Sequence, residues 1–156
     1  MIECSFENGH QARLRHVTAD AVLLRGDNIL LVRRADHLVE GGKLALPGGY
    51  LDRDETIQEG IRREILEETG FDCSSLEFIS VFSSPNRPGD NRQNVTFIFS
   101  AQIGNQLGVP DEEVSSLHWF PLDDLPPPES VAFDHMAGIE AFLKRKSGEQ
   151  LAPSVE

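Results

Sequence analysis

The sequence predicts a single α/β domain, and three observations lead to that prediction. The chain has 156 residues, a length that suits one domain with an apolar core of its own. Runs of β-branched and aliphatic residues alternate with two segments of helical periodicity. No segment repeats at a fixed period or has a low-complexity composition. We therefore expect one domain over residues 1–156, with its core at about 16–146 and a flexible tail at 147–156.

The first regular element that the sequence indicates is a β-hairpin. Two aliphatic runs, Ala21–Leu24 and Ile29–Val32, flank the turn-forming tetrapeptide Arg25–Asn28. The polar, glycine-containing segment Asp36–Lys43 should form a loop. A short apolar run at Leu44–Leu46 follows this loop, and a Pro-Gly-Gly triplet then turns the chain.

A helix is expected next, from Thr56 to Thr69. Isoleucines recur there at four-residue intervals, which is typical of an amphipathic helix. Asp54 or Glu55 would provide negative charge at the positive N-terminal end of the helix dipole. Gly70 would end the helix, because glycine readily adopts the left-handed conformation of a C-terminal cap.

The second half of the chain predicts three strands and one more helix. Strands are expected over Leu76–Phe82, Asn94–Ile103 and Leu117–Pro121. The loop Ser83–Gln93 separates the first two, and a loop of this length inside a compact domain is often functional. A terminal helix over Phe133–Lys146 has cationic side chains at its negative C-terminal end.

Charge and composition argue against several classes of protein. The chain has 14 Lys and Arg against 26 Asp and Glu, and its net charge of −12 would repel a nucleic acid backbone, so no nucleic-acid partner is expected. Cys4 and Cys73 are too few for a disulfide framework, which favours a reducing, cytoplasmic location. The N-terminus lacks a signal-peptide pattern, and no apolar run reaches the ~18 residues of a membrane span. We expect no membrane partner.

Three glutamates in the second half of the predicted helix form a candidate cation site. Glu64, Glu67 and Glu68 have i, i+3, i+4 spacing, which places their carboxylates on one helix face. This face adjoins the isoleucine stripe, and the helix dipole disfavours negative charge near its C-terminal end. A hard divalent cation such as Mg²⁺ would compensate these charges, because carboxylate oxygens are its usual ligands. The alternative is an ordinary solvated acidic face.

These glutamates are part of a longer pattern. The chain matches G-x5-E-x7-R-E-U-x-E-E-x-G-U, where U is a bulky aliphatic residue, at Gly49, Glu55, Arg63, Glu64, Ile65, Glu67, Glu68, Gly70 and Phe71. The pattern resembles the box of the Nudix hydrolase family. It departs mildly at Phe71, where the family prefers an aliphatic residue, and at Gly60, where the family often has alanine. The resemblance covers about residues 16–146 and implies a Nudix-type α/β/α sandwich with a mixed β-sheet between helices.

The resemblance also implies a set of metal ligands. Mg²⁺ or Mn²⁺ would be held by the backbone carbonyl of Gly48 and the carboxylates of Glu64, Glu67 and Glu68. Arg63, with Glu55 or with a ligand carboxylate, would form a pair that fixes the helix and its acids in one geometry, since a guanidinium can bond two carboxylate oxygens at once. An ordinary surface salt bridge is the alternative for this pair.

Members of the family hydrolyse a nucleoside diphosphate linked to another moiety, with water attacking one phosphorus of the pyrophosphate. Metal ions would neutralise the phosphate oxygens and acidify the bound water. A carboxylate would accept the water proton, and Glu64 is one candidate for this base. Glu112 or Glu113, in a downstream loop, is the other candidate unless both are merely solvated.

The loop Ser83–Gln93 bears on the substrate. It looks like the corresponding segment of ADP-ribose pyrophosphatases, which often carry a proline about fifteen residues past the box glycine, as Pro85 stands after Gly70. Arg87 and Arg92 would clamp a phosphate or the terminal ribose, unless they are solvated arginines of a plain loop. The expected substrate is ADP-ribose or a related nucleotide sugar or dinucleotide. A nucleoside triphosphate pyrophosphatase and a non-catalytic nucleotide-binding sensor stay open, as does a homodimer.

Overall fold

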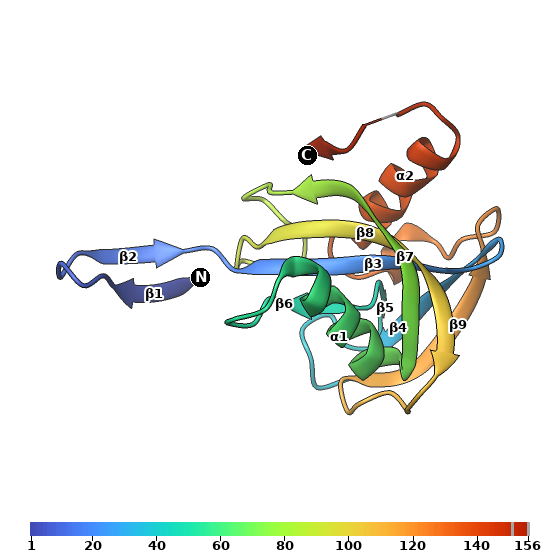
Figure 1. The fold of residues 1–156 in the computed structure, drawn as a ribbon, viewed down its shortest axis with the longest axis horizontal. Helices are drawn as coiled ribbons and strands as arrows, with labels where there is room; N and C mark the ends of the chain where they lie inside the picture. Colours follow the sequence, from blue (N-terminus) through green and yellow to red (C-terminus); the bar gives the residue numbers. More distant parts are fainter. Residues whose placement is uncertain (151, 156) are drawn as a thin grey trace.

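The computed structural model describes residues 1–150 and 152–155, which form a small β-hairpin, a larger mixed sheet and two α-helices (Figure 1). The elements, in chain order, are β1 (Ile2–Ser5), β2 (Gln11–Leu14), β3 (Val17–Arg25), β4 (Asn28–Arg34), β5 (Leu44–Ala45), β6 (Gly48–Tyr50), α1 (Ile57–Thr69), β7 (Phe71–Phe82), β8 (Val95–Gln106), β9 (Val114–Pro121), the short 3₁₀ helix η1 (Pro128–Ser130), α2 (His135–Lys146) and β10 (Ser154–Val155).

The central position of β3 organises the larger sheet. The strand order is β10-β7-β8-β3-β4-β5, with β6 paired to β3 and β9 paired to β4. β8 runs parallel to β3, whereas β4 and β6 run antiparallel to it. The register with β6 places Gly48 opposite Asp20 and Gly49 opposite Ala19. The Pro-Gly-Gly turn is thereby fixed beside the first half of β3.

The two faces of β3 pack against different helices. One buried cluster contains Ala21 and Leu23 together with two isoleucines of α1. The other contains Val22 and Leu24 together with buried side chains of α2. Because successive side chains of a strand point to opposite faces, α1 and α2 cover opposite faces of the sheet. The predicted α/β/α sandwich with a mixed sheet is confirmed.

The sequence prediction did not identify the N-terminal cap of α1. Thr56 caps the helix: its hydroxyl accepts a hydrogen bond from the Glu59 N–H, and the Glu59 carboxylate accepts one from the Thr56 N–H at 2.7 Å. This reciprocal pair satisfies backbone donors that the first turn leaves free. The cap is therefore Thr56 with Glu59, and Asp54 and Glu55 precede it in the chain. Gly70 ends the helix with φ 75°, as predicted.

The start of α2 also differs from the prediction. Phe133 has φ 53°, outside the helical range, so the helix begins at His135 after Asp134 at the N-cap position. None of the helices that the structure describes combines the length and the apolar character needed to cross a bilayer.

Several strands lie outside the predicted segments. β7 begins at Phe71 and β8 continues to Gln106, because the two strands stay paired through a polar stretch without regular alternation. β1 and β2 form a separate antiparallel hairpin that extends from the body of the protein (Figure 1). In the segment predicted as a flexible tail, Ser154–Val155 pair in parallel with β7.

Candidate active site

A pocket of about 290 Å³ lies where α1, β3 and β6 meet. Its lining contains both acidic and cationic side chains. The acidic ones are Asp20, Glu64, Glu68, Asp90 and Glu113, and the cationic ones are Arg34, Arg87 and Arg92. These residues come from segments that are far apart in the sequence, so the fold is what brings them together. We call this hollow the acidic pocket.

Glu68 is the most deeply buried of the three clustered glutamates on α1. It is 5% exposed, and its Oε2 accepts a hydrogen bond from the Gly48 N–H at 2.9 Å. Burial raises the pKa of Glu68 well above its usual range, and the nearby carboxylates of Glu64 and Asp20 raise it further. Burial also raises the pKa of Glu64, against the opposing effect of Arg63. The pocket thus concentrates negative charge that the protein only partly balances.

Gly48 and Gly49 allow the backbone of β6 to lie close to these acids. A Cβ atom on Gly49 would stand 2.6 Å from the Glu64 carboxyl carbon. A Cβ atom on Gly48 would collide with the Ala19 carbonyl oxygen. A side chain at position 48 would collide with the backbone of β3, whereas one at position 49 would require the Glu64 carboxylate or β6 to shift. The role of the Gly48 carbonyl as a metal ligand stays a prediction.

Arg63 connects the acids of α1 to the loop before the helix. Its Nη2 and Nε donate to the two carboxylate oxygens of Glu55 at 2.8 and 3.2 Å, and Nη2 also donates to the Tyr50 carbonyl. Nη1 donates to Glu64 at 2.8 Å and to Glu67 at 3.0 Å. Hydrogen bonding to Glu55 raises the pKa of Arg63, and the same bonds lower the pKa of Glu55. The Arg63–Glu55 pair is therefore part of a network of several bonds, more than a single surface ion pair.

The donor chemistry of the acidic pocket fits a hard divalent cation. Asp20 Oδ2 is buried and accepts no hydrogen bond from the part of the chain that the structure describes. Carboxylate oxygens that lack compensation are the ligands that Mg²⁺ and Mn²⁺ take. Among residues 1–150 and 152–155, however, no three His, Cys, Asp or Glu side chains already lie close enough to hold one ion. The carboxylates would have to converge on the cation, and Glu67 would have to leave Arg63.

Arg87 lines the pocket, but its side chain is tightly held. Its side chain is 6% exposed, and Nε donates to Asp134 Oδ1 at 2.7 Å. Its guanidinium carbon stands 4.8 Å from the centre of the Phe133 ring. Pro85, in the same loop, does not line the pocket in the described part of the chain. The loop thus contributes its arginine rather than its proline to the site.

Arg92 also lines the pocket and is more exposed than Arg87. Its Nε donates to Asp90 Oδ1 at 2.9 Å, and its Nη1 donates to the Tyr50 hydroxyl. The Tyr50 ring is 39% exposed, lines the pocket, and lies 4.9 Å from the His16 ring between centroids. An aromatic surface therefore adjoins the arginines.

The sequence interpretation missed Asp20 and His135. His135 is 5% exposed, its Nδ1 accepts a hydrogen bond from the Leu46 N–H at 2.9 Å, and its Nε2 lies 3.2 Å from Arg87 Nη2. Nε2 lies 3.5 Å from Asp20 Oδ2. Burial, with Arg87 and Arg34 nearby, lowers the pKa of His135 well below its usual value, so the ring is neutral. An aspartate within the otherwise apolar, buried run 19–24 was a usable signal for Asp20.

The profile of the NUDIX domain matches residues 14–142, which include the acids of α1 and most of the pocket. The chain belongs to the Nudix family. The resemblance found in the sequence is confirmed.

Two curated relatives and one solved structure illustrate the similarity to other Nudix proteins. The ADP-ribose pyrophosphatase of Methanocaldococcus jannaschii is 34% identical over 133 residues, 85% of this chain and 75% of the relative. The NAD-capped RNA hydrolase NudC of Pseudomonas aeruginosa is 28% identical over 127 residues, 81% of this chain but only 44% of NudC. The NUDIX domain of Shewanella oneidensis NrtR, complexed with ADP ribose, has a TM-score of 0.71 and 29% identity, covering 86% of this chain and 90% of that one.

The lining of the acidic pocket distinguishes between the candidates for the general base. Glu64 and Glu113 both line it, and Glu113 is close enough to raise the pKa of Glu64. Both loop glutamates are exposed, but Glu112 is absent from the lining that the described residues form. Of the two adjacent loop glutamates, the geometry therefore favours Glu113.

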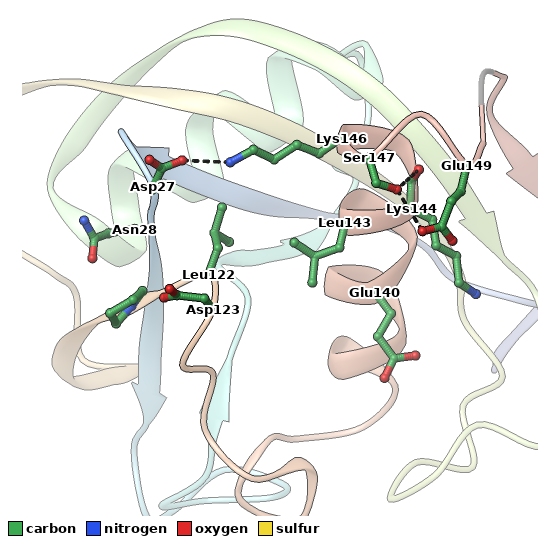
Figure 2. Close-up of a pocket in the computed structure, with 11 residues that line it drawn as sticks. Asp27, Asn28, Leu122, Asp123, Glu140, Leu143, Lys144, Lys146, Ser147 and Glu149 are labelled. Carbon is green, nitrogen blue, oxygen red and sulfur yellow. Dashed lines mark hydrogen bonds and ion pairs between the residues drawn. The ribbon is translucent and has the colours of Figure 1, made fainter.

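A larger hollow of about 820 Å³ lies away from the Nudix box, between α2 and the β3–β4 turn. Figure 2 shows Lys146 reaching across it to Asp27, and the two atoms of this ion pair are 2.8 Å apart. Leu122 and Leu143 contribute apolar surface to the hollow. None of the predicted site residues lines it in the described part of the chain, so its size does not make it the catalytic pocket.

Proposed function

We propose that this Nudix protein uses Mg²⁺ or Mn²⁺ to hydrolyse the diphosphate of a nucleoside diphosphate linked to another moiety, with ADP-ribose as the first candidate. The observation that carries the proposal is the presence of carboxylates and guanidinium groups around one pocket. An anionic diphosphate can contact the guanidinium groups directly, but it can approach the carboxylates only through a cation. The similarity to an ADP-ribose pyrophosphatase supports the choice of substrate.

The cation would be held by Glu64, Glu68 and the Gly48 carbonyl, with Glu67 joining after it leaves Arg63. A bound divalent cation neutralises phosphate oxygens and acidifies a water molecule. Arg63 orients Glu64 through its bonds to the carboxylate and to the loop before α1. Because these bonds already restrict the Glu64 side chain, it would lose less conformational freedom on binding the ion.

The arginines that line the pocket would bind the substrate. Arg87 is already fixed by Asp134 and Phe133, so it would lose little side-chain freedom on contacting a phosphate. Arg92 would bind a second anionic group or the terminal ribose. The exposed Tyr50 ring beside it offers a surface on which a nucleobase can stack.

Turnover of a substrate panel tests this function. We expect ADP-ribose to be cleaved to AMP and ribose 5-phosphate with Mg²⁺ or Mn²⁺, and turnover to stop when EDTA removes the cation. Dinucleotides, nucleotide sugars and nucleoside triphosphates would be measured beside it. Preferred cleavage of a triphosphate would instead assign the protein to the nucleotide-sanitising alternative.

A sensor that binds ADP-ribose without cleaving it is the second candidate function. The likeness to the NrtR domain complexed with ADP ribose supports it. The complete set of acids in the Nudix box favours hydrolysis instead. Calorimetric binding of ADP-ribose without turnover in any divalent cation would decide for the sensor.

The general base can be assigned with three Glu→Gln variants. Glu113→Gln should lower kcat by about 10²–10⁴-fold with little change in KM, because Glu113 would take a proton only during the reaction. Glu112→Gln, one residue away and outside the pocket, is the matched control and should keep wild-type kcat. A large loss in Glu64→Gln alone, with cation affinity retained, would transfer the assignment to Glu64.

We also propose a cytoplasmic location, for which the presence of only two cysteines, Cys4 and Cys73, is the support. A small-molecule nucleotide is the proposed partner, supported by the likeness to the NrtR domain complexed with ADP ribose. The homodimer stays a prediction.

A further inference from the structure

Asp20 is a carboxylate of the acidic pocket that lies outside the Nudix box. It is 5% exposed and projects from β3 directly opposite Gly48 in the sheet register. Its Oδ2 is buried and accepts no hydrogen bond from any described residue. A buried carboxylate without a partner is strongly unfavourable unless a positive group compensates it. The folded protein therefore contains a buried carboxylate oxygen that no described residue compensates with a hydrogen bond.

The nearby cationic and donor groups leave Asp20 only partly compensated. Arg87 Nη2 is 4.0 Å from Asp20 Oδ2, beyond hydrogen-bond distance, while its Nε is engaged by Asp134. His135 Nε2 lies 3.5 Å from the same oxygen and 3.2 Å from Arg87 Nη2, and the ring is neutral. Both groups lie beside the carboxylate, but neither forms a hydrogen bond with Oδ2.

Asp20 and Glu68 flank the same backbone segment. The Gly48 N–H donates to Glu68 Oε2 at 2.9 Å, and a Cβ built on Gly48 would stand 2.5 Å from Asp20 Oδ1. Glu68 and Asp20 also interact electrostatically, each being part of the same pocket. One cation beside Gly48 would therefore be within reach of a carboxylate from β3 as well as one from α1.

We propose that Asp20 is a further ligand of the divalent cation in this pocket, beside Glu64 and Glu68. The proposal rests on the proposed function, which places a cation here.

Binding of Mn²⁺ without substrate, followed by the electron paramagnetic resonance of the free ion, tests this assignment. Asp20→Asn should weaken Mn²⁺ affinity by about tenfold or more. Asp90→Asn is the matched control, because Asp90 lines the same pocket but is already bonded to Arg92 at 2.9 Å. Its affinity should change by less than about twofold. Unchanged affinity in Asp20→Asn, or an equal loss in both variants, would overturn the proposal.

A measurement on the unmutated protein covers the case in which Asp20→Asn does not fold. The chain is labelled with ¹³C at aspartate carboxylates, and Mn²⁺ is added. Electron–nuclear double resonance should then show a coupling between Mn²⁺ and the ¹³C nucleus of the Asp20 carboxylate. The ligands of the Nudix box are glutamates and a glycine carbonyl, which carry no label and give no such coupling. Absence of the coupling with Mn²⁺ bound would overturn only the Asp20 assignment. A wild-type protein that binds no Mn²⁺ would instead contradict the proposed function.

Discussion

Glu68→Gln is expected to remove most turnover and at the same time to stabilise the cation-free protein. The amide keeps an oxygen that can accept the hydrogen bond from the Gly48 N–H, but it carries no buried charge. We expect kcat/KM to fall by about 10²–10³-fold, the scale for losing one group that stabilises transition-state charge. The free energy of unfolding without cation should rise by on the order of 1–3 kcal/mol.

The pH dependence of stability provides a second readout for Glu68. Its pKa is raised in the folded state, so the folded protein keeps a proton at pH values where the unfolded chain has lost it. This contribution to stability is fully present below the unfolded pKa of about 4.3 and is lost as pH rises through the folded pKa. Burial raises the pKa of Asp20 to about 7, and Asp20 therefore acts in the same direction. Wild-type stability in EDTA should fall from about pH 5 to about pH 8, and Glu68→Gln should reduce that slope.

Glu140→Gln on α2 is the control for both measurements. Glu140 is exposed and lies outside the acidic pocket, so this variant removes the same charge without affecting the proposed cation site. Turnover, stability and pH slope should stay close to those of the wild type. If Glu68→Gln keeps full turnover, or if it lowers the stability of the cation-free protein, Glu68 is not an uncompensated acid awaiting an ion.

Local patterns in the sequence were enough to predict much of the fold. The isoleucine stripe indicated α1, and the paired aliphatic runs around Arg25–Asn28 indicated the β3–β4 hairpin. The extension of β7 to Phe71 was missed because pairing with β8, not side-chain alternation, holds that polar stretch in place. Hairpin β1–β2 and the two-residue strand β10 are short and have weak patterns, so their pairing could not be inferred from composition.

In the site, as in the fold, local sequence patterns predicted some features, whereas others depend on tertiary contacts. The Nudix box predicted the Arg63–Glu55 pairing because its spacing on a helix and the preceding loop fixes both residues. Asp20 and His135 meet only because the sheet register and the start of α2 bring β3 and α2 together. Glu112 and Glu113 are adjacent in sequence, and only the course of the chain into β9 gives Glu113 the place in the pocket.

Gly49→Ala is expected to impair catalysis through a steric contact with Glu64, without removing a charged group. The new Cβ atom would stand 2.6 Å from the Glu64 carboxyl carbon, so Glu64 or the β6 backbone must shift. A displacement of this size near reacting groups can cost about 100-fold in rate, and we expect a loss of that order in kcat/KM together with weaker Mn²⁺ binding. The matched control is Gly108→Ala, whose Cβ would meet its nearest heavy atom only at 3.9 Å.

A double-mutant cycle identifies Glu64 as the group that Gly49 accommodates. Glu64→Ala removes the carboxylate that the added methyl group would strike. Adding Gly49→Ala to that background should therefore lower the free energy of unfolding much less than it does in the wild type, because residues in contact are not additive. Equal costs in both backgrounds would locate the strain elsewhere in β6. Full turnover in the Gly49→Ala single variant would mean that catalysis does not depend on where Glu64 is held.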